Sequence, residues 1–235
     1  MCKQEGYKGG VLIIGSLYWG DKDCRKEWRE DHLDMDSMIY VHAPIMYGRL
    51  SSSRHNTYTM ILSRTCYPDK MGNVILIPLK KPVKDMKDFK NETKALWYAE
   101  GGLKDKVRGS WGSVGLLVRE DSDFKEKLEE EWKAFYKTLP SINKPSFAKE
   151  ENGKPIISDD GILNIYWVNT IENGEAVNLD FILATATKPE DELPKSQIIA
   201  ESMVENCYTR YFCMNRKLGI PHSKTKRYLR YLSIK

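Results

Sequence analysis

The chain has 235 residues, of which 41% are hydrophobic and 30% are charged, and its formal net charge is +4. These values are typical of a folded globular protein and exclude a disordered chain. A net charge this small argues against a dedicated nucleic-acid binder, which usually carries a concentrated basic face. The late basic residues Lys224, Lys226, Arg227, Arg230 and Lys235 are therefore interpreted as a solvated terminal helix.

The cysteines and the apolar runs indicate the cellular compartment. The five cysteines are odd in number and none forms a Cys-x-x-Cys pair, so neither a disulfide framework nor a zinc site is indicated. Free thiols are typical of a reducing compartment. Residues 1–10 lack the apolar segment of a signal peptide, and runs such as residues 11–14 are far shorter than a membrane span. We expect a cytosolic protein without a membrane partner.

The first half of the chain is mainly extended. β-Branched and apolar runs predict strands over residues 11–14, 38–46, 57–62 and 73–78. Pro44 interrupts the second run, which indicates an edge or a bend. The charged segment from Asp23 to Leu33 predicts a short helix or an ordered loop.

The second half mixes helices and strands. Helical periodicity predicts a helix over residues 85–100, a second one after the capping residues 121–123, and a long one over residues 194–217 that ends at Gly219 and Pro221. Strands are predicted over residues 111–118 and, as an antiparallel pair around the turn 172–174, over residues 162–171 and 176–187.

This order of elements favours an α+β fold. Strands follow one another, with helices between some of them, which predicts a mixed, largely antiparallel sheet or a small barrel with flanking helices. Neither the dinucleotide-binding glycine fingerprint nor the phosphate-loop signature is present. We expect one domain over residues 1–235.

The first predicted strand ends in Gly15-Ser16-Leu17. A glycine at this point lets the backbone approach a ligand closely, and the amide N–H groups that follow can act as fixed donors to a carboxylate or phosphate. Tyr18 beside the turn can contribute to a pocket wall. The alternative is that Gly15 only ends a strand.

Three adjacent glutamates, Glu129, Glu130 and Glu131, follow the strand over residues 111–118. With about 100° per residue, Glu131 lies beside the apolar stripe of its helix while Glu130 faces away. A carboxylate at the border of an apolar face is partly desolvated, which raises its pKa and suits it to general acid–base work. The alternative is a solvated charge run.

A dense polar segment runs from Tyr47 to Arg54 and contains Ser51, Ser52 and Ser53. The Arg54 guanidinium can fork onto a carboxylate or phosphate, and the Ser53 hydroxyl can add a donor. A plain polar loop is an equally good interpretation of this segment.

Taken together, these pieces resemble the γ-glutamylcyclotransferase-like superfamily. The resemblance rests on short motifs in a shared order, and they are Ile14-Gly15-Ser16-Leu17, Leu50-Ser51-Ser52-Ser53-Arg54, Val74-Ile75-Leu76-Ile77-Pro78, Trp111-Gly112-Ser113-Val114-Gly115, and Gln197-Ile198-Ile199-Ala200 followed by Leu218-Gly219-Ile220-Pro221. Two departures stand out. Ile14 replaces the tyrosine that usually precedes Gly-Ser, and the stretches 81–110 and 140–161 resemble insertions.

The resemblance implies an enzyme that cleaves a γ-glutamyl amide and forms 5-oxoproline without a cofactor or metal. It implies that Glu131, or else Glu130 or Glu129, moves the proton, that Gly15, Ser16 and Leu17 hold the substrate carboxylate, and that Tyr18, Ser53 and Arg54 assist. One alternative is a non-catalytic protein that binds an anionic metabolite or nucleotide in the same pocket. Another, ranked lower because of the small net charge, is an adaptor that uses the basic C-terminal residues.

Overall fold

The computed structural model describes residues 6–54, 56–140, 147, 154–205 and 209–220. The basic residues at positions 224–235 lie outside this range, as do most of residues 140–153. The described elements in chain order are β1 Gly9–Ile13, α1 Ser16–Trp19, α2 Asp23–His32, β2 Ile39–Ala43, β3 Ile45–Ser51, β4 Thr57–Leu62, β5 Gly72–Pro78, α3 Met86–Ala99, β6 Arg108–Gly109, β7 Gly112–Val118, α4 Lys125–Lys137, β8 Phe181–Thr187, α5 Ser196–Glu205 and α6 Thr209–Lys217, with short 3-10 turns at Met35–Ser37, Ser52–Arg54 and Arg64–Cys66.

The main layer is a six-stranded mixed sheet with the order β2-β5-β1-β8-β7-β6. Its pairs are antiparallel except for the parallel pair of β1 and β8. The two central strands β1 and β8 are almost wholly buried, as their continuous apolar sequences require. Among the described strands, β2 and β6 are the edges of this sheet. The predicted α+β fold with a mixed, mostly antiparallel sheet is therefore confirmed, in its open rather than its barrel form.

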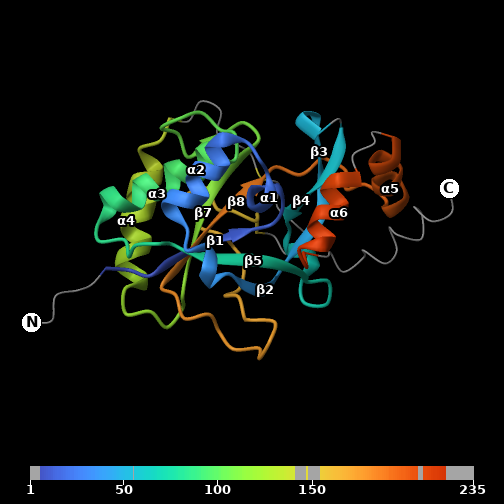
Figure 1. Ribbon diagram of the computed structural model, residues 1–235. Coiled ribbons are helices and arrows are strands. Elements are labelled where there is room, and N and C mark those ends of the chain that lie inside the picture. The colour runs from blue at the N-terminus through green and yellow to red at the C-terminus, as the bar shows by residue number, and fades with distance from the viewer. Residues whose placement is uncertain (1–5, 55, 141–146, 148–153, 206–208, 221–235) are drawn as a thin grey trace, which may run out of the picture.

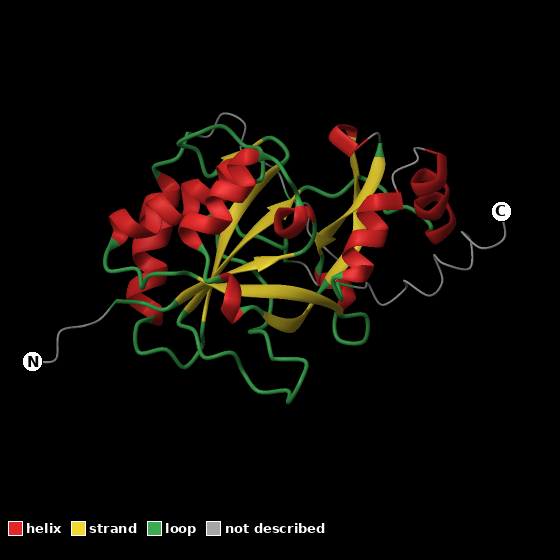
Figure 2. Ribbon diagram, in the orientation of Figure 1, coloured by secondary structure: helices red, strands yellow, loops and turns green. Residues whose placement is uncertain are grey.

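Strands β3 and β4 form a separate two-stranded ribbon. Pro44 lies between β2 and β3, so the single extended run predicted over residues 38–46 divides there and its two halves enter different sheets. This is the bend that proline indicated, because it cannot donate to a ladder. Figure 2 shows the ribbon beside the main sheet, with α6 packed along it.

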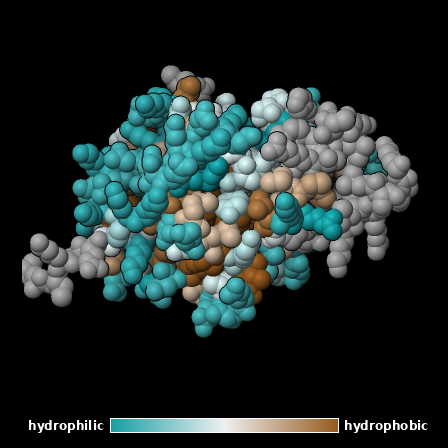
Figure 3. Space-filling view, viewed as in Figure 1, coloured by the Kyte–Doolittle hydropathy of each residue, from teal (hydrophilic) through white to brown (hydrophobic). Residues whose placement is uncertain are grey.

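Helices α2, α3 and α4 cover one face of the main sheet (Figure 1). The buried ring of Phe89 on α3 lies 4.8 Å from that of Phe181 on β8 and 5.4 Å from that of Trp132 on α4, measured between centroids. These contacts join both helices to the sheet. The segment that resembled an insertion, residues 81–110, thus supplies a core helix. Figure 3 shows hydrophilic side chains over the outer side of these helices.

One prediction about the late chain is wrong in part. The turn at residues 172–174 forms, and Asn169 bridges Ala176, but β8 pairs with β1 and β7 instead of with residues 162–171. The near-complete burial of β8 favours an interior position in the main sheet over one strand of a surface hairpin. The predicted long helix over residues 194–217 corresponds to α5 and α6, and residues 206–208 between them lie outside the described residues. It ends at Lys217, followed by Gly219 at φ +68°, as predicted.

No helix in the described part of the chain combines the length and the apolar character needed to cross a membrane.

An ion pair between α2 and α3 makes the stability of the fold depend on pH. His32 Nδ1 lies 2.8 Å from Glu92 Oε2, and both side chains are more than two-thirds buried. The hydrogen bond to Glu92 raises the pKa of His32, against the opposing effect of burial. Because the folded pKa is raised, the stabilisation is fully present below the unfolded pKa of about 6.5 and is lost as the pH rises through the folded pKa.

We expect His32→Gln to lower the free energy of unfolding by about 0.5–1.5 kcal/mol at pH 5.5 and by clearly less at pH 8.5. Urea unfolding at the two pH values measures the difference. The matched control is His42→Gln, since His42 is exposed on β2 and takes no part in the α2–α3 contact. An equal loss of stability at both pH values would contradict the assignment.

Candidate functional site

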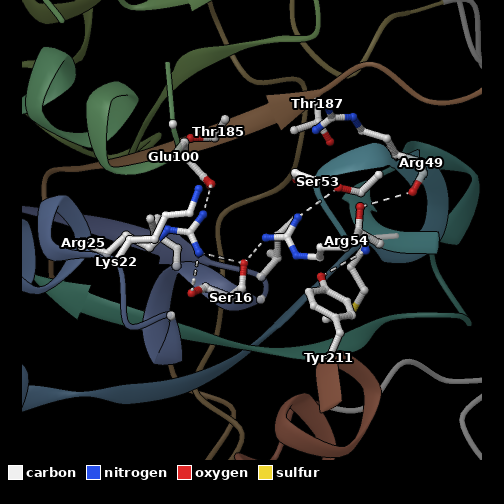
Figure 4. Close-up of a pocket in the computed structure, with 18 of the residues that line it drawn as sticks. Ser16, Lys22, Arg25, Arg49, Ser53, Arg54, Glu100, Thr185, Thr187 and Tyr211 are labelled. Atoms are coloured by element: carbon white, nitrogen blue, oxygen red, sulfur yellow. Dashed lines mark hydrogen bonds and ion pairs between the residues drawn. The ribbon is translucent and has the colours of Figure 1, made fainter. Parts of the chain in front are cut away.

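A cavity of about 380 Å³ opens between the end of β1, the β3–β4 ribbon, the end of α3 and β8. This volume is within the range of small-molecule sites. Its lining is rich in charge, with four cationic side chains against two carboxylates. The charged lining residues are Asp21, Lys22, Arg25, Arg49, Arg54 and Glu100. Figure 4 shows how the labelled side chains converge on it.

The turn that follows β1 forms one wall of the cavity. Gly15 precedes α1, and a Cβ atom at this position would lie 2.6 Å from the Tyr211 hydroxyl of α6. Glycine is therefore required here by close packing. It lets the buried Tyr211 ring approach the turn, and the Tyr211 hydroxyl accepts from the backbone N–H of Met60 in β4 at 3.3 Å.

Two arginines of α2 hold this turn in place. Arg29 donates to the carbonyl oxygens of Leu17 at 2.7 Å and Gly20 at 2.9 Å. Arg25, which is 6% exposed, donates to the carbonyl and the hydroxyl oxygen of Ser16 at 3.2 and 3.1 Å. The Nε of Arg25 also donates to the carbonyl of Ala99 at 3.0 Å, which ties the turn to the end of α3.

Glu100 lies at that end of α3. Phe89, Thr93 and Leu96 form the buried stripe of the helix, and Glu100 continues it at the i+4 position after Leu96. The chain then turns away at Gly101, whose φ of +94° lies in the left-handed region that favours glycine. The helix thereby ends with a carboxylate directed into the cavity instead of into the core.

The surroundings of Glu100 control its protonation. Burial raises the pKa of this carboxyl, while the guanidiniums of Arg25, Arg54 and Arg49 oppose that rise. The Thr185 hydroxyl acts in the same direction as the arginines, although it approaches the carboxylate without the geometry of a full hydrogen bond. Only 22% of the Glu100 side chain is exposed, and this part faces the cavity. Its ion pair with Arg25 is loose, at 3.9 Å, which leaves the carboxylate oxygens available to a ligand.

Arg54 crosses the middle of the cavity. It donates to Ser51 Oγ at 3.2 Å and to Ser16 Oγ, and its guanidinium lies over the Tyr211 ring at 5.2 Å. Ser16 Oγ therefore accepts from both Arg54 and Arg25. Because a hydroxyl oxygen has two acceptor sites, its hydrogen remains to donate to a ligand.

Most of the predicted binding residues meet in this cavity. Gly15, Ser16, Leu17, Ser53 and Arg54 line it, and Ser53 is within 3.1 Å of Ser51 through their hydroxyls. Tyr18 does not belong to the lining among the described residues, whereas its neighbour Trp19 does. The indole of Trp19 donates to Asn215 on α6 at 2.9 Å, which fixes it at the cavity wall.

The three predicted catalytic glutamates lie elsewhere. Glu129, Glu130 and Glu131 are on α4 and do not line the cavity; Glu129 pairs with Lys133 at 2.8 Å, and Glu130 is exposed. The buried side chains of α4 that Glu131 borders pack against Phe89 of α3 and Ser113 of β7, so a carboxylate beside them does not face the cavity. The carboxylates that line the cavity are instead Asp21 and Glu100, and Arg25 links Glu100 to the turn.

Glu100 and Arg25 were missed, although the sequence carried a signal for each. Both are charged residues placed in line with buried positions of a helix, Glu100 after Leu96 and Arg25 before Trp28. A charge on a buried stripe needs a partner or a function. The pair Gly101-Gly102 directly after Glu100 marked the helix end at which such a charge can turn out of the core.

Comparisons of the chain with models of protein families, with curated proteins and with solved structures find no match.

The close contact between Gly15 and Tyr211 leaves no room for a larger residue at position 15. We expect Gly15→Ala to lower the free energy of unfolding by about 1–3 kcal/mol, because the added methyl overlaps the Tyr211 hydroxyl. Tyr211→Phe removes that oxygen, and the nearest remaining ring atom then lies 3.3 Å from the new methyl.

A double-mutant cycle measures this coupling by urea unfolding. The double variant should be more stable than the sum of the two single effects indicates, by about 1 kcal/mol or more. Purely additive effects would show that the glycine is not required by this ring.

Proposed function

We propose that the protein is a γ-glutamylcyclotransferase-type enzyme, which cleaves a γ-glutamyl amide and releases 5-oxoproline. The observation that carries this proposal is the Glu100 carboxylate, held deep in a cationic cavity beside the Gly15-Ser16-Leu17 turn. A cavity with one deep carboxylate and an excess of guanidiniums complements a zwitterion, whose ammonium meets the carboxylate while its own carboxylate meets the cations.

The γ-glutamyl group fits this distribution of charge. Its α-carboxylate would lie against the turn, where the Ser16 hydroxyl and the first N–H groups of α1 are donors and Arg54 supplies the charge. Its α-ammonium would then face Glu100. The loop from Ser51 to Ser53 would close the side of the cavity opposite α1.

The reaction needs only a proton carrier and fixed geometry. Glu100 accepts a proton from the α-ammonium, and the resulting amine attacks the side-chain carbonyl carbon and forms the new C–N bond of the five-membered ring. As the bond from that carbon to the amide nitrogen breaks, the protons lost by the α-nitrogen pass through Glu100 to the leaving amine. The raised pKa of Glu100 brings it closer to neutral pH, where a residue that both accepts and returns a proton works best.

A second candidate is a non-catalytic protein that binds an anionic metabolite or nucleotide in the same cavity. The excess of cationic lining residues favours it, as does Ile14, which lines the cavity without the hydroxyl of the tyrosine usual in the resembling family. Turnover of a γ-glutamyl compound distinguishes the two candidates.

We expect wild-type protein to release 5-oxoproline from a γ-glutamyl compound and Glu100→Gln to lose roughly 100- to 10,000-fold in kcat, because the proton carrier is removed. Mass spectrometry of the products measures both. The rate should fall as the pH drops through the raised pKa of Glu100, since only the ionised carboxylate accepts a proton.

Glu131→Gln is the matched control, and it should retain full turnover because Glu131 lies on α4 outside the cavity. Binding without turnover in the wild-type protein would instead support the second candidate. Loss of turnover in Glu131→Gln, with Glu100→Gln active, would refute the placement of the proton carrier.

A further inference from the structure

The end of the cavity opposite Glu100 is built around Arg49 of β3. Its guanidinium lies over the ring of Trp111 at 4.9 Å from the centroid. Trp111 in turn stacks on the buried Trp97, with centroids 4.4 Å apart and planes at 17°. Two stacked indoles thus support one guanidinium through a cation–π contact, which helps to hold its N–H donors at this end of the cavity.

The charge of Arg49 is not neutralised by this wall. No carboxylate of the described residues comes within 4.0 Å of the Arg49 nitrogens, whereas Arg25 has Glu100 at 3.9 Å. Burial lowers the pKa of Arg49, and the nearby Arg54 lowers it further; Glu100 and Glu190 oppose this only from a longer distance. A partly buried guanidinium that faces a cavity without a counter-charge is a site for an anion.

Strand β8 runs along the cavity and gives the distance between this end and the Glu100 end. Thr185 lies beside Glu100, and Thr187 is two residues further along the same face of the strand. Thr187 pairs in register with Gly112, the neighbour of Trp111, and its buried hydroxyl has no hydrogen-bond partner among the described residues. Two residues of a strand span about 6.7 Å, so the two ends are separated by roughly that distance. Figure 4 shows Glu100 and Arg25 at one end, Arg49 and Thr187 at the other, and Arg54 between them.

We infer that Arg49, Trp111 and Thr187 form a second anion-binding subsite, so that the cavity takes a ligand with an oxyanion roughly 7 Å from the group that faces Glu100. The planar Arg49 fork can pair with a carboxylate or a phosphate-type group through two parallel hydrogen bonds, and the Thr187 hydroxyl adds a third donor. In the proposed reaction, on which this choice of probes rests, the oxyanion belongs to the leaving amine and is untouched by the chemistry. A cavity that only binds its ligand would use the subsite in the same way.

Three matched ligands test the subsite. γ-Glutamylalanine carries a carboxylate, its 1-aminoethylphosphonate analogue carries a phosphonate, and γ-glutamylethylamide carries no second anion. Their dissociation constants are measured by calorimetry on Glu100→Gln, which prevents turnover from complicating the binding. We expect at least one of the two ligands with a second anionic group to bind tenfold or more tightly than the ethylamide. The tighter of the two shows whether the subsite prefers a carboxylate or a phosphonate.

Arg49→Met in the same background should reduce this preference to about onefold, while Arg49→Lys should retain part of it, because the charge remains without the fork. Arg216→Met is the control, since Arg216 is exposed on α6 away from the cavity, and it should leave the preference unchanged. The inference is overturned if the ethylamide binds as well as both dianions, or if the preference survives in Arg49→Met.

A second comparison separates this inference from the proposed function. Adipate and its monoamide contain no γ-glutamyl group, and the rise in melting temperature that each produces is measured on wild-type protein and on Arg49→Met. A larger rise with adipate that disappears in Arg49→Met supports the subsite even where no γ-glutamyl compound is turned over. Equal rises with the two compounds, together with equal affinities in the first series, overturn it.

Discussion

One buried guanidinium, that of Arg25, connects the three segments that make up the deep end of the cavity. It projects from α2, donates to both oxygens of Ser16 in the turn after β1, and donates to the last carbonyl of α3 beside Glu100. Its removal would take one donor from each of three acceptors, the two oxygens of Ser16 and the carbonyl of Ala99, and would leave Glu100 without its closest cation. The spacing between the turn and the carboxylate, and with it the proposed chemistry, depends on this residue.

The cavity concentrates charge at a cost to stability that the rest of the fold offsets. Glu100, Arg49 and Arg54 lose part of their hydration, and burial moves the pKa of Glu100 upwards and that of Arg49 downwards, so each charged form is disfavoured. A dense apolar core between the helices and β8 supplies the compensating stability. Buried charges with shifted pKa values in a cavity are typical of sites that bind or transform ligands.

Local patterns predicted the elements well and their partners less well. Three local patterns predicted the structure correctly, because each depends on residues within one segment. They are the apolar run over residues 11–14, the proline at position 44 and the helical period over residues 85–100. The partners of β8 and the position of Glu100 depend on which segments meet in space, and local periodicity contains no information on that. The cavity-lining residues Gly15, Ser16, Leu17, Ser53 and Arg54 follow strand ends, and their position was therefore predictable. The family resemblance implied a carboxylate on the helix after residues 111–118, whereas Glu100 lies in the stretch 81–110 that resembled an insertion.

The central claim is that Glu100 faces the amine of a γ-glutamyl ligand, and a crystal structure of Glu100→Gln with γ-glutamylalanine tests it most directly. The account predicts the ligand α-nitrogen within about 3.2 Å of the side-chain oxygen at position 100, with the α-carboxylate against residues 15–17. A ligand bound in the reverse direction, with a carboxylate facing position 100, or bound outside the cavity, would contradict it.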